Sequence, residues 1–155
     1  MVHTAATDSQ LWQIFCDGSA VPNPGYMALG AVITAPDGTQ HTLSRATHTR
    51  GCNNEAELLA LMAALQNAQS RGAQALRIFT DNSILVEQLS TQNAKPIERL
   101  AGLFDDARAL LGAFGEVSLK WIPRHRNGEA DTLARAALGL LPKSAMKPSN
   151  KKKRA

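Results

Sequence analysis

One long helical pattern divides the strand-like segments of this chain into two groups and so limits how they can pair. In residues 53–70 apolar side chains recur at helical spacing, and Gly72 follows as a stop signal. Three strand-like runs precede this helix, and a fourth, at residues 75–80, follows it. A crossover of this length allows the fourth strand to lie parallel to an earlier one. We therefore predict an α/β fold with a mixed sheet.

Further apolar runs complete a sheet of five strands. The first three should form an antiparallel meander, with turns at 23–25 and 36–39. The predicted order is βββαβααβα, with three antiparallel and two parallel strands flanked by helices. We expect strands at about 11–17, 29–35, 40–46, 75–80 and 117–122, and helices at about 53–70, 83–91, 97–113 and 129–138.

The charge of the chain is unevenly distributed. The chain has 17 Lys and Arg against 13 Asp and Glu, but six of the basic residues lie in 142–155, which contains no acid. Residues 1–141 therefore hold 11 basic and 13 acidic residues, a net charge of −2. We predict a disordered N-terminus over 1–9, one domain over 10–141 and a disordered basic tail over 142–155.

The composition also predicts where the protein works. No apolar stretch approaches the length of a membrane span, and the first residues lack the pattern of a signal peptide. Cys16 and Cys52 have neither CxxC spacing nor partners for a zinc cluster, so we expect two reduced thiols. These features favour a cytoplasmic protein, which we expect to be a monomer.

Four acidic residues stand near strand ends and helix starts. Asp17 and Asp81 each end an apolar run that should form a central strand, whereas Glu57 and Asp131 begin helical patterns. Ligands of open α/β sheets gather at the carboxyl ends of parallel strands, so these acids can converge around a cation. Each acid also has a purely structural interpretation, as a turn former, a capping box or a dipole partner. Helical periodicity does not choose between Glu57 and Glu55.

His125 follows the fifth predicted strand in the loop Pro123-Arg124-His125-Arg126. A histidine among arginines in a loop is an unusual core residue. Proton transfer and an ordinary surface role are both open for it.

Five short motifs follow one another along the chain. They are Asp17-Gly18-Ser19 with Asn23-Pro24-Gly25, Cys52-Asn53-Asn54-Glu55-Ala56-Glu57-Leu58, Thr80-Asp81-Asn82, Trp121-Ile122-Pro123-Arg124-His125, and Asp131-Thr132-Leu133-Ala134. In this order they resemble type 1 ribonuclease H over roughly residues 10–140, which implies a ribonuclease H-like fold. The second motif is similar to the family pattern Thr-Asn-Asn-x-x-Glu-Leu, and this similarity favours Glu57 over Glu55.

The resemblance implies an endonuclease that hydrolyses the RNA strand of RNA–DNA hybrids and leaves 3′-hydroxyl and 5′-phosphate ends. It also implies two Mg²⁺ ions, which Mn²⁺ could replace. Asp17 would bridge both ions, Glu57 and Asp81 would complete one, and Asp131 the other. His125 would assist proton transfer or product release. Acids this close should have raised pKa values while no metal is bound.

Substrate recognition is implied by the same motifs. The groups expected to contact RNA 2′-hydroxyls are near Gly18, Ser19, Asn53 and Asn54. The groups expected to hold the DNA strand are Asn23, Arg50, Cys52 and Asn54, the last two in a phosphate pocket. The asparagines could also serve as helix caps and turn formers.

The chain departs from the family pattern where it should hold its substrate. Cys52 stands where the family usually has Thr, and a thiol is a weaker hydrogen-bond donor than a hydroxyl. Ser83 replaces a commoner Gln. A basic, Trp-bearing protrusion is missing, because residues 82–116 contain no Trp and only three cations, Lys95, Arg99 and Arg108. One hypothesis is that the tail, with Lys151, Lys152, Lys153 and Arg154, binds phosphates instead; the alternative is an expendable solvated tail.

Three other functions compete with this one. A hybrid-binding module without catalysis should have a damaged acid set, whereas all four positions are intact here. A 3′–5′ exonuclease of the same fold would carry Asp-x-Glu where this chain has Asp17-Gly18-Ser19. Activity on double-stranded RNA stays open.

Overall fold

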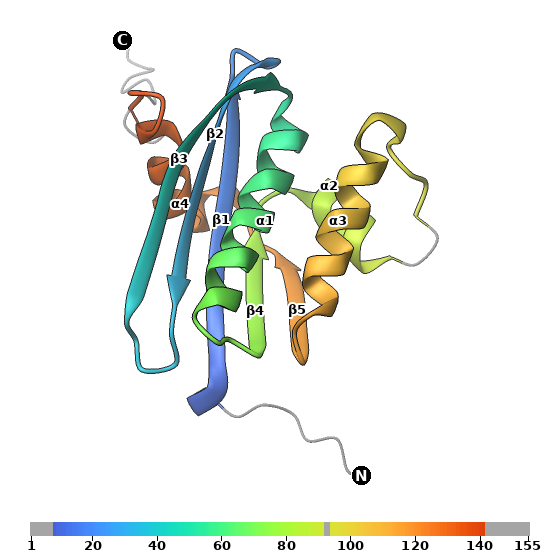
Figure 1. Cartoon of the computed structure of the whole chain (residues 1–155). Helices are drawn as coiled ribbons and strands as arrows, with labels where there is room; N and C mark the ends of the chain where they lie inside the picture. Colours follow the sequence, from blue (N-terminus) through green and yellow to red (C-terminus); the bar gives the residue numbers. More distant parts are fainter. Residues whose placement is uncertain (1–7, 92–93, 142–155) are drawn as a thin grey trace.

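A mixed five-stranded sheet forms the centre of the computed structural model, which describes residues 8–91 and 94–141 (Figure 1). The strand order is β3-β2-β1-β4-β5. β1 pairs antiparallel with β2, and β2 with β3, whereas β4 is parallel to both β1 and β5. This arrangement confirms the predicted fold class. The strands are β1 (Leu11–Val21), β2 (Gly25–Thr34), β3 (Gln40–Gly51), β4 (Ala75–Thr80) and β5 (Glu116–Trp121).

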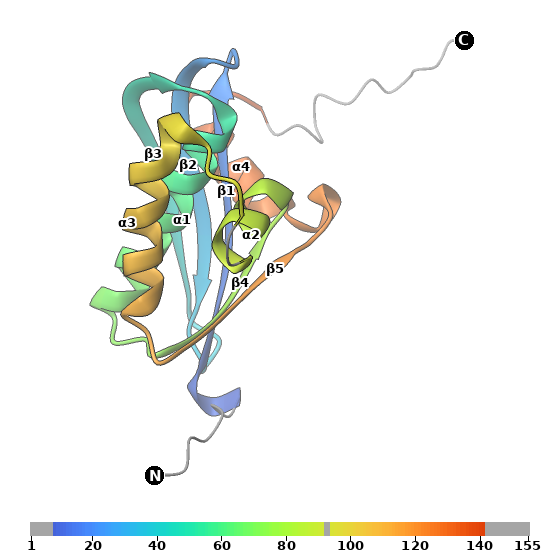
Figure 2. The ribbon, with the colours of Figure 1, turned by 90° about the vertical axis from the view of Figure 1, so that its right-hand side faces the viewer.

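Helices cover both faces of the sheet. α1 packs across β1 and β2 on one face, α4 packs across the same strands on the other, and α3 lies against α1 (Figure 2). α2 contacts β5, α1 and α3. The helices are α1 (Asn53–Ser70), α2 (Ser83–Ser90), α3 (Ala101–Gly112) and α4 (Gly128–Ala136), and the short 3-10 turns are η1 (Asp8–Gln10), η2 (Glu98–Leu100) and η3 (Arg124–Arg126).

The strands of the meander are longer than predicted, and this moves the first acid. β1 was expected to end at Asp17, but it continues to Val21, so Asp17 lies inside the strand. The parallel ladder of β1 with β4 stops at the pair Phe15 and Phe79, whereas the antiparallel ladder with β2 runs on. Small polar residues after an apolar run look like a strand end in the sequence, yet an antiparallel partner can still pair with their backbone.

Other boundaries agree within a few residues, apart from the predicted helix at 97–113. Its first turn forms η2, and α3 begins at Ala101. The described structure starts with η1, inside the segment expected to be disordered. The rest of that segment, at 1–7, and the tail at 142–155 lie outside the described residues, so the domain limits stay a prediction.

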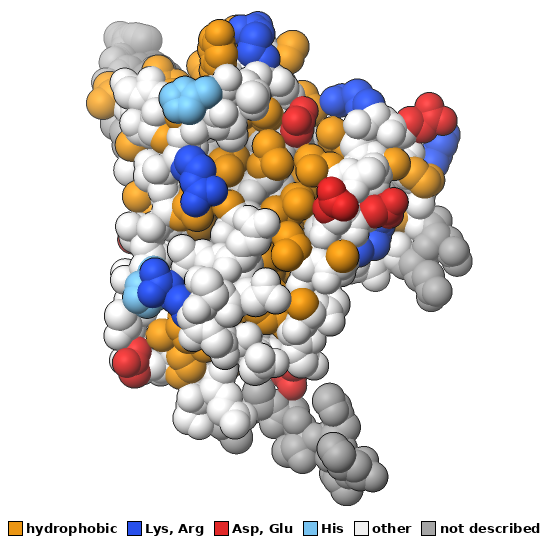
Figure 3. All heavy atoms as spheres, viewed as in Figure 1, with side chains coloured by type: hydrophobic (Ala, Val, Ile, Leu, Met, Phe, Trp, Pro, Cys, Tyr) orange, Lys and Arg blue, Asp and Glu red, His pale blue; other side chains and the backbone are white. Residues whose placement is uncertain are grey.

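The core lies between α1, α3 and the sheet. Leu58, Leu61 and Leu65 of α1 are fully buried against strand residues such as Ile14 and Ile78. Each such side chain contributes about 1.5–3 kcal/mol to stability. Apolar side chains are also visible along the strip where α1 meets α3 (Figure 3).

Both cysteines carry free thiols, as predicted, with Cys16 buried and Cys52 half-buried. Within the described ranges, no helix combines the length and apolar character needed to span a membrane.

Candidate metal centre

Three carboxylates meet where the parallel ladder ends. Asp17 and Asp81 each stand two residues beyond the last pair of β1 and β4, so they lie at the same level of the sheet. Glu57 approaches them from α1. The carboxylate oxygens of Asp17, Glu57 and Asp81 come within 4.8 Å of one another. The convergence that strand ends predicted is therefore present for these three acids.

Gly18 allows the helix to come this close. A side chain at Gly18 would overlap the backbone of Ala56 and Glu57, so only glycine fits between β1 and α1 here. The Gly18 N–H donates to Glu57 Oε1 and to Asp17 Oδ1, both at 3.0 Å. The Gly18 N–H therefore holds the two carboxylates, and the expected contact of groups near Gly18 with RNA 2′-hydroxyls stays a prediction.

The tertiary structure also separates the two glutamates that periodicity left equal. Glu57 is buried, and it is the glutamate that lies beside Asp17 and Asp81. Glu55 is only half-buried and stands outside the cluster.

The electrostatics of the cluster favour a bound cation. Burial raises the pKa of Glu57 well above its usual value, and the nearby Asp17 and Asp81 raise it further, against the lowering effect of the Gly18 N–H. Burial and the same three acids raise the pKa of the Cys16 thiol beneath them. Three oxygen ligands that repel one another, two of them buried and the third, from Asp81, half-buried, suit a hard divalent cation such as Mg²⁺ or Mn²⁺.

Asp131 lies outside this compact group but on an adjoining helix. It occupies the first turn of α4 and is buried. At Gly30, which pairs with Asp17, a side chain would overlap the backbone of Ala130 and Ala134. Paired residues of antiparallel strands share one face of the sheet, so Asp17 is on the face that α4 covers. The fourth acid is thus buried in the helix that packs over the first.

Asn127 belongs to this site although the sequence did not identify it. Its Nδ2 donates to Asp81 Oδ2 at 3.1 Å and to the carbonyl oxygen of Cys16 at 2.9 Å, and only 2% of the residue is exposed. Asn before a helix usually caps it, but this side chain makes no cap hydrogen bond to α4. In the sequence, an asparagine just before a helix predicts a helix cap, so the pattern did not reveal the contact of Asn127 with Asp81.

His125 lies on η3, exposed, in the segment that leads from β5 to α4. The structure does not include it in the acid cluster. Its exposure leaves the imidazole accessible to solvent and to a ligand.

The asparagines predicted to contact nucleic acid join α1 to its neighbours: Asn23 and Asn53 link it to β1 and the β1–β2 turn, and Asn54 links it to the start of α2. Asn23 Oδ1 accepts from the Asn53 N–H at 3.0 Å, and Asn53 Oδ1 accepts from the Ala20 N–H at 2.9 Å. Asn54 Oδ1 accepts from Asn82 Nδ2 at 2.9 Å. These amides therefore have structural roles, but as links between elements: the residue that precedes α1, Cys52, makes no side-chain cap hydrogen bond.

The remaining predicted contacts surround the start of α1. Arg50 lies over the Tyr26 ring at 5.2 Å, and Ser19 is buried in β1. Cys52 is the residue just before α1, and its Sγ accepts from Arg99 Nη1 at 3.3 Å. Lys151, Lys152, Lys153 and Arg154 lie outside the described residues.

A sheet of this order with three carboxylates at the end of its parallel ladder defines a ribonuclease H-like domain. The family described as reverse transcriptase-like matches residues 15–137. A bifunctional protein of Mycobacterium tuberculosis is 35% identical over 133 residues, which are 85% of this chain and 36% of that protein. A ribonuclease H of Pelobacter propionicus is 30% identical over 148 residues, covering 86% of this chain and 88% of the relative. The chain belongs to the ribonuclease H family.

Solved structures agree with this assignment. The N-terminal RNase H domain of the Mycobacterium tuberculosis protein matches with a TM-score of 0.74 and 35% identity, over 82% of this chain and 98% of that one. LC11-RNase H1, isolated from compost, has been solved in complex with an RNA/DNA hybrid. It matches with a TM-score of 0.72 and 26% identity, over 88% of this chain and 99% of that one. The chain spans only about a third of the length of the mycobacterial relatives that it matches.

Proposed function

We propose that this protein is an endonuclease that hydrolyses the RNA strand of RNA–DNA hybrids. The observation that carries the proposal is the convergence of Asp17, Glu57 and Asp81, with oxygens within 4.8 Å, in a domain of the ribonuclease H family. A relative of the same fold, LC11-RNase H1, has been solved with an RNA/DNA hybrid bound, which supports the substrate class.

The residues fit a pair of divalent cations, Mg²⁺ or Mn²⁺ by donor type. Asp17, Glu57 and Asp81 would hold them together with Asp131 from α4. When bound, such ions supply Lewis-acid stabilisation of the phosphate and lower the pKa of the attacking water. The expected products carry 3′-hydroxyl and 5′-phosphate ends.

The protein's own contribution is to hold these carboxylates in one arrangement. Gly18 directs Glu57 and Asp17 through its N–H, and Asn127 directs Asp81 through its amide. Ligands oriented by a second layer of hydrogen bonds lose less freedom when substrate arrives. His125, exposed on η3, would transfer a proton at the scissile phosphate or assist product release. All of these residues come from one chain, which fits action as a monomer.

Hybrid recognition would use the start of α1 and the β1–β2 turn. Backbone and amide groups near Gly18, Ser19, Asn53 and Asn54 would contact the RNA 2′-hydroxyls, and Asn23, Arg50, Cys52 and Asn54 would hold the DNA strand. Because the asparagines already tie the turn to the helix, these contacts would form on a surface that is ordered before binding.

A comparison of duplexes tests the proposal. Matched RNA–DNA, RNA–RNA and DNA–DNA duplexes are incubated with Mg²⁺, with Mn²⁺ and with a chelator, and the ends of the fragments are mapped. We expect cleavage of the RNA strand of the hybrid alone, only with metal. Asp81→Asn should reduce the rate by at least about a hundredfold. Hybrid binding without cleavage under any metal would instead support the non-catalytic alternative, and cleavage of RNA–RNA would show a broader specificity.

A further inference from the structure

We propose that Arg99 is a substrate-binding residue that anchors a phosphate of the DNA strand beside Cys52, at the start of α1. The inference rests on the proposed function and adds to it a residue outside the motifs that suggested hybrid binding.

Arg99 reaches Cys52 across 47 residues of sequence, from η2 to the residue that precedes α1. Its Nη1 donates to the Cys52 Sγ at 3.3 Å, and the side chain is exposed. Sulfur is a weak acceptor, and a guanidinium has five N–H donors. Most of the hydrogen-bonding capacity of Arg99 therefore stays available for a ligand that approaches Cys52.

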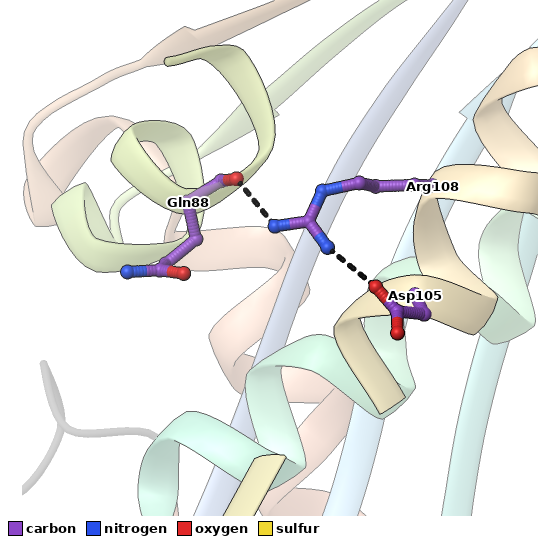
Figure 4. Close-up of polar contacts among 3 residues, drawn as sticks. All are labelled: Gln88, Asp105 and Arg108. Carbon is purple, nitrogen blue, oxygen red and sulfur yellow. Dashed lines mark hydrogen bonds and ion pairs between the residues drawn. The ribbon is translucent and has the colours of Figure 1, made fainter. Parts of the chain in front are cut away.

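The neighbouring arginine shows the contrast. Arg108 donates to Asp105 Oδ1 and to the carbonyl oxygen of Gln88, both at 3.0 Å (Figure 4). The buried Gln88 in turn donates to the Lys95 carbonyl oxygen at 2.7 Å. These contacts tie α2 to α3 and position the segment that carries Arg99. The guanidinium of Arg108 thus donates to two oxygen acceptors within the fold, whereas that of Arg99 donates to the Cys52 Sγ at the start of α1.

The place that Arg99 occupies favours an anion. α1 has 18 residues, and its start presents backbone N–H groups and the positive end of the helix dipole. Although burial opposes it, the pKa of the Cys52 thiol is lowered, because Arg99 and the N–H groups of Glu55 and Asn54 stabilise the thiolate. An environment that stabilises a thiolate will also stabilise a phosphate oxygen.

The chemistry of Cys52 explains why a cation is useful at this point. A thiol donates a weaker hydrogen bond than the hydroxyl that the family pattern has here. An arginine fork binds phosphate through two parallel N–H···O bonds, which are roughly twice as strong as neutral ones. Arg99 would therefore compensate for the phosphate affinity that the pocket loses because it has a thiol at Cys52 instead of a hydroxyl.

The test combines protein variants with single methylphosphonates, which remove one backbone charge at a time from either strand of the hybrid. Arg99→Ala is compared with Arg71→Ala, a control that removes the same charge about 25 Å away at the other end of α1. We expect Arg99→Ala to raise Kd and KM about tenfold with little change in kcat, and Arg71→Ala to leave both constants unchanged. One methylphosphonate in the DNA strand should weaken binding by the wild type much more than it weakens binding by Arg99→Ala.

Each result decides the inference separately from the proposed function. If the wild type cleaves hybrids and Arg99→Ala behaves like Arg71→Ala, the role of Arg99 is wrong and the function stands. If the wild type binds hybrids without cleaving them, the function fails, and the methylphosphonate scan still tests Arg99 by binding. Sensitivity confined to an RNA-strand phosphate would also overturn the inference. Arg99→Gln, which preserves the length of the side chain, provides a second variant if Arg99→Ala does not fold.

Discussion

At the scale of single residues, two hydrogen-bond donors orient the acids of this site. The Gly18 N–H lies between Asp17 and Glu57, and the Asn127 amide joins Asp81 to the backbone of β1. Neither donor is itself ionisable, so a search for charged residues does not find them. They nevertheless determine where the carboxylate oxygens lie before any cation binds.

Replacement of Asn127 tests this role. Asn127→Ala leaves the buried Cys16 carbonyl without its donor and releases Asp81, so the free energy of unfolding should fall by about 1–3 kcal/mol. The affinity for Mg²⁺, measured by titration calorimetry, should fall as well. Asn67→Ala, at the far end of α1, should change stability by less than about 0.5 kcal/mol. Unchanged metal affinity in Asn127→Ala would show that the amide is only structural.

The fourth acid has a direct test, because its helix offers a matched control. Asp131 and Glu129 both lie in the first turn of α4, but only Asp131 is buried. Asp131→Asn should lower Mg²⁺-dependent hybrid cleavage by at least about a hundredfold, and Glu129→Gln should leave it close to the wild type. Steady-state rates on one labelled hybrid measure both. Full activity in Asp131→Asn would remove this residue from the metal site.

At the scale of elements, close packing at two glycines places the helices. Gly18 admits α1 on one face of β1, and Gly30 admits α4 on the other face of the sheet. The two contacts bring Glu57 and Asp131 to the strand that carries Asp17. The geometry of the site therefore depends on how closely α1 and α4 pack on the sheet, as well as on the acids themselves.

Gly30→Ala should separate α4 from the sheet. Its Cβ would overlap the backbone of Ala130 and Ala134, so we expect a loss of about 1–3 kcal/mol in unfolding free energy, together with lower cleavage because Asp131 moves. Chemical denaturation and the hybrid assay measure the two effects. Gly102→Ala, at a helical position with open space, should be neutral or stabilising by up to about 1 kcal/mol. Normal stability in Gly30→Ala would mean that α4 tolerates a shift.

At the scale of the whole molecule, the buried acids link stability to pH. The folded state binds a proton on Glu57 more tightly than the unfolded chain does, because burial and then Asp17 and Asp81 raise its pKa. The free energy of unfolding of the metal-free protein should therefore fall as pH rises from the ordinary pKa of glutamate towards the raised one.

Denaturation in the presence of a chelator, between about pH 4 and pH 8, measures this dependence. Glu57→Gln should flatten it and raise stability at neutral pH, and added Mg²⁺ should stabilise the wild type more than the variant. Equal slopes in the two proteins would show that Glu57 is not the group responsible.

The charge distribution of the whole chain predicts a role for the basic tail. Residues 1–141 have a net charge of −2, whereas residues 142–155 hold six basic side chains. Removal of 142–155 should raise KM for a hybrid and make its salt dependence shallower, by about 0.9 in the log–log slope for each phosphate that the tail neutralises. Cleavage assays over a range of salt concentrations measure both quantities. An unchanged KM and slope would identify the tail as expendable.

The sequence by itself determined the order of elements, the mixed sheet and the set of candidate acids, because periodicity, turn residues and motifs are local properties of the chain. The strand registers, the position of Asp17 inside β1 and the choice of Glu57 on packing grounds came only from the tertiary structure. So did the inward-facing Asn127 and the contact between Arg99 and Cys52. These features depend on how closely segments that are distant in the sequence approach one another. That approach is set by tertiary packing, such as the close contact of α1 and α4 with the sheet at Gly18 and Gly30, and not by the pattern of any single segment.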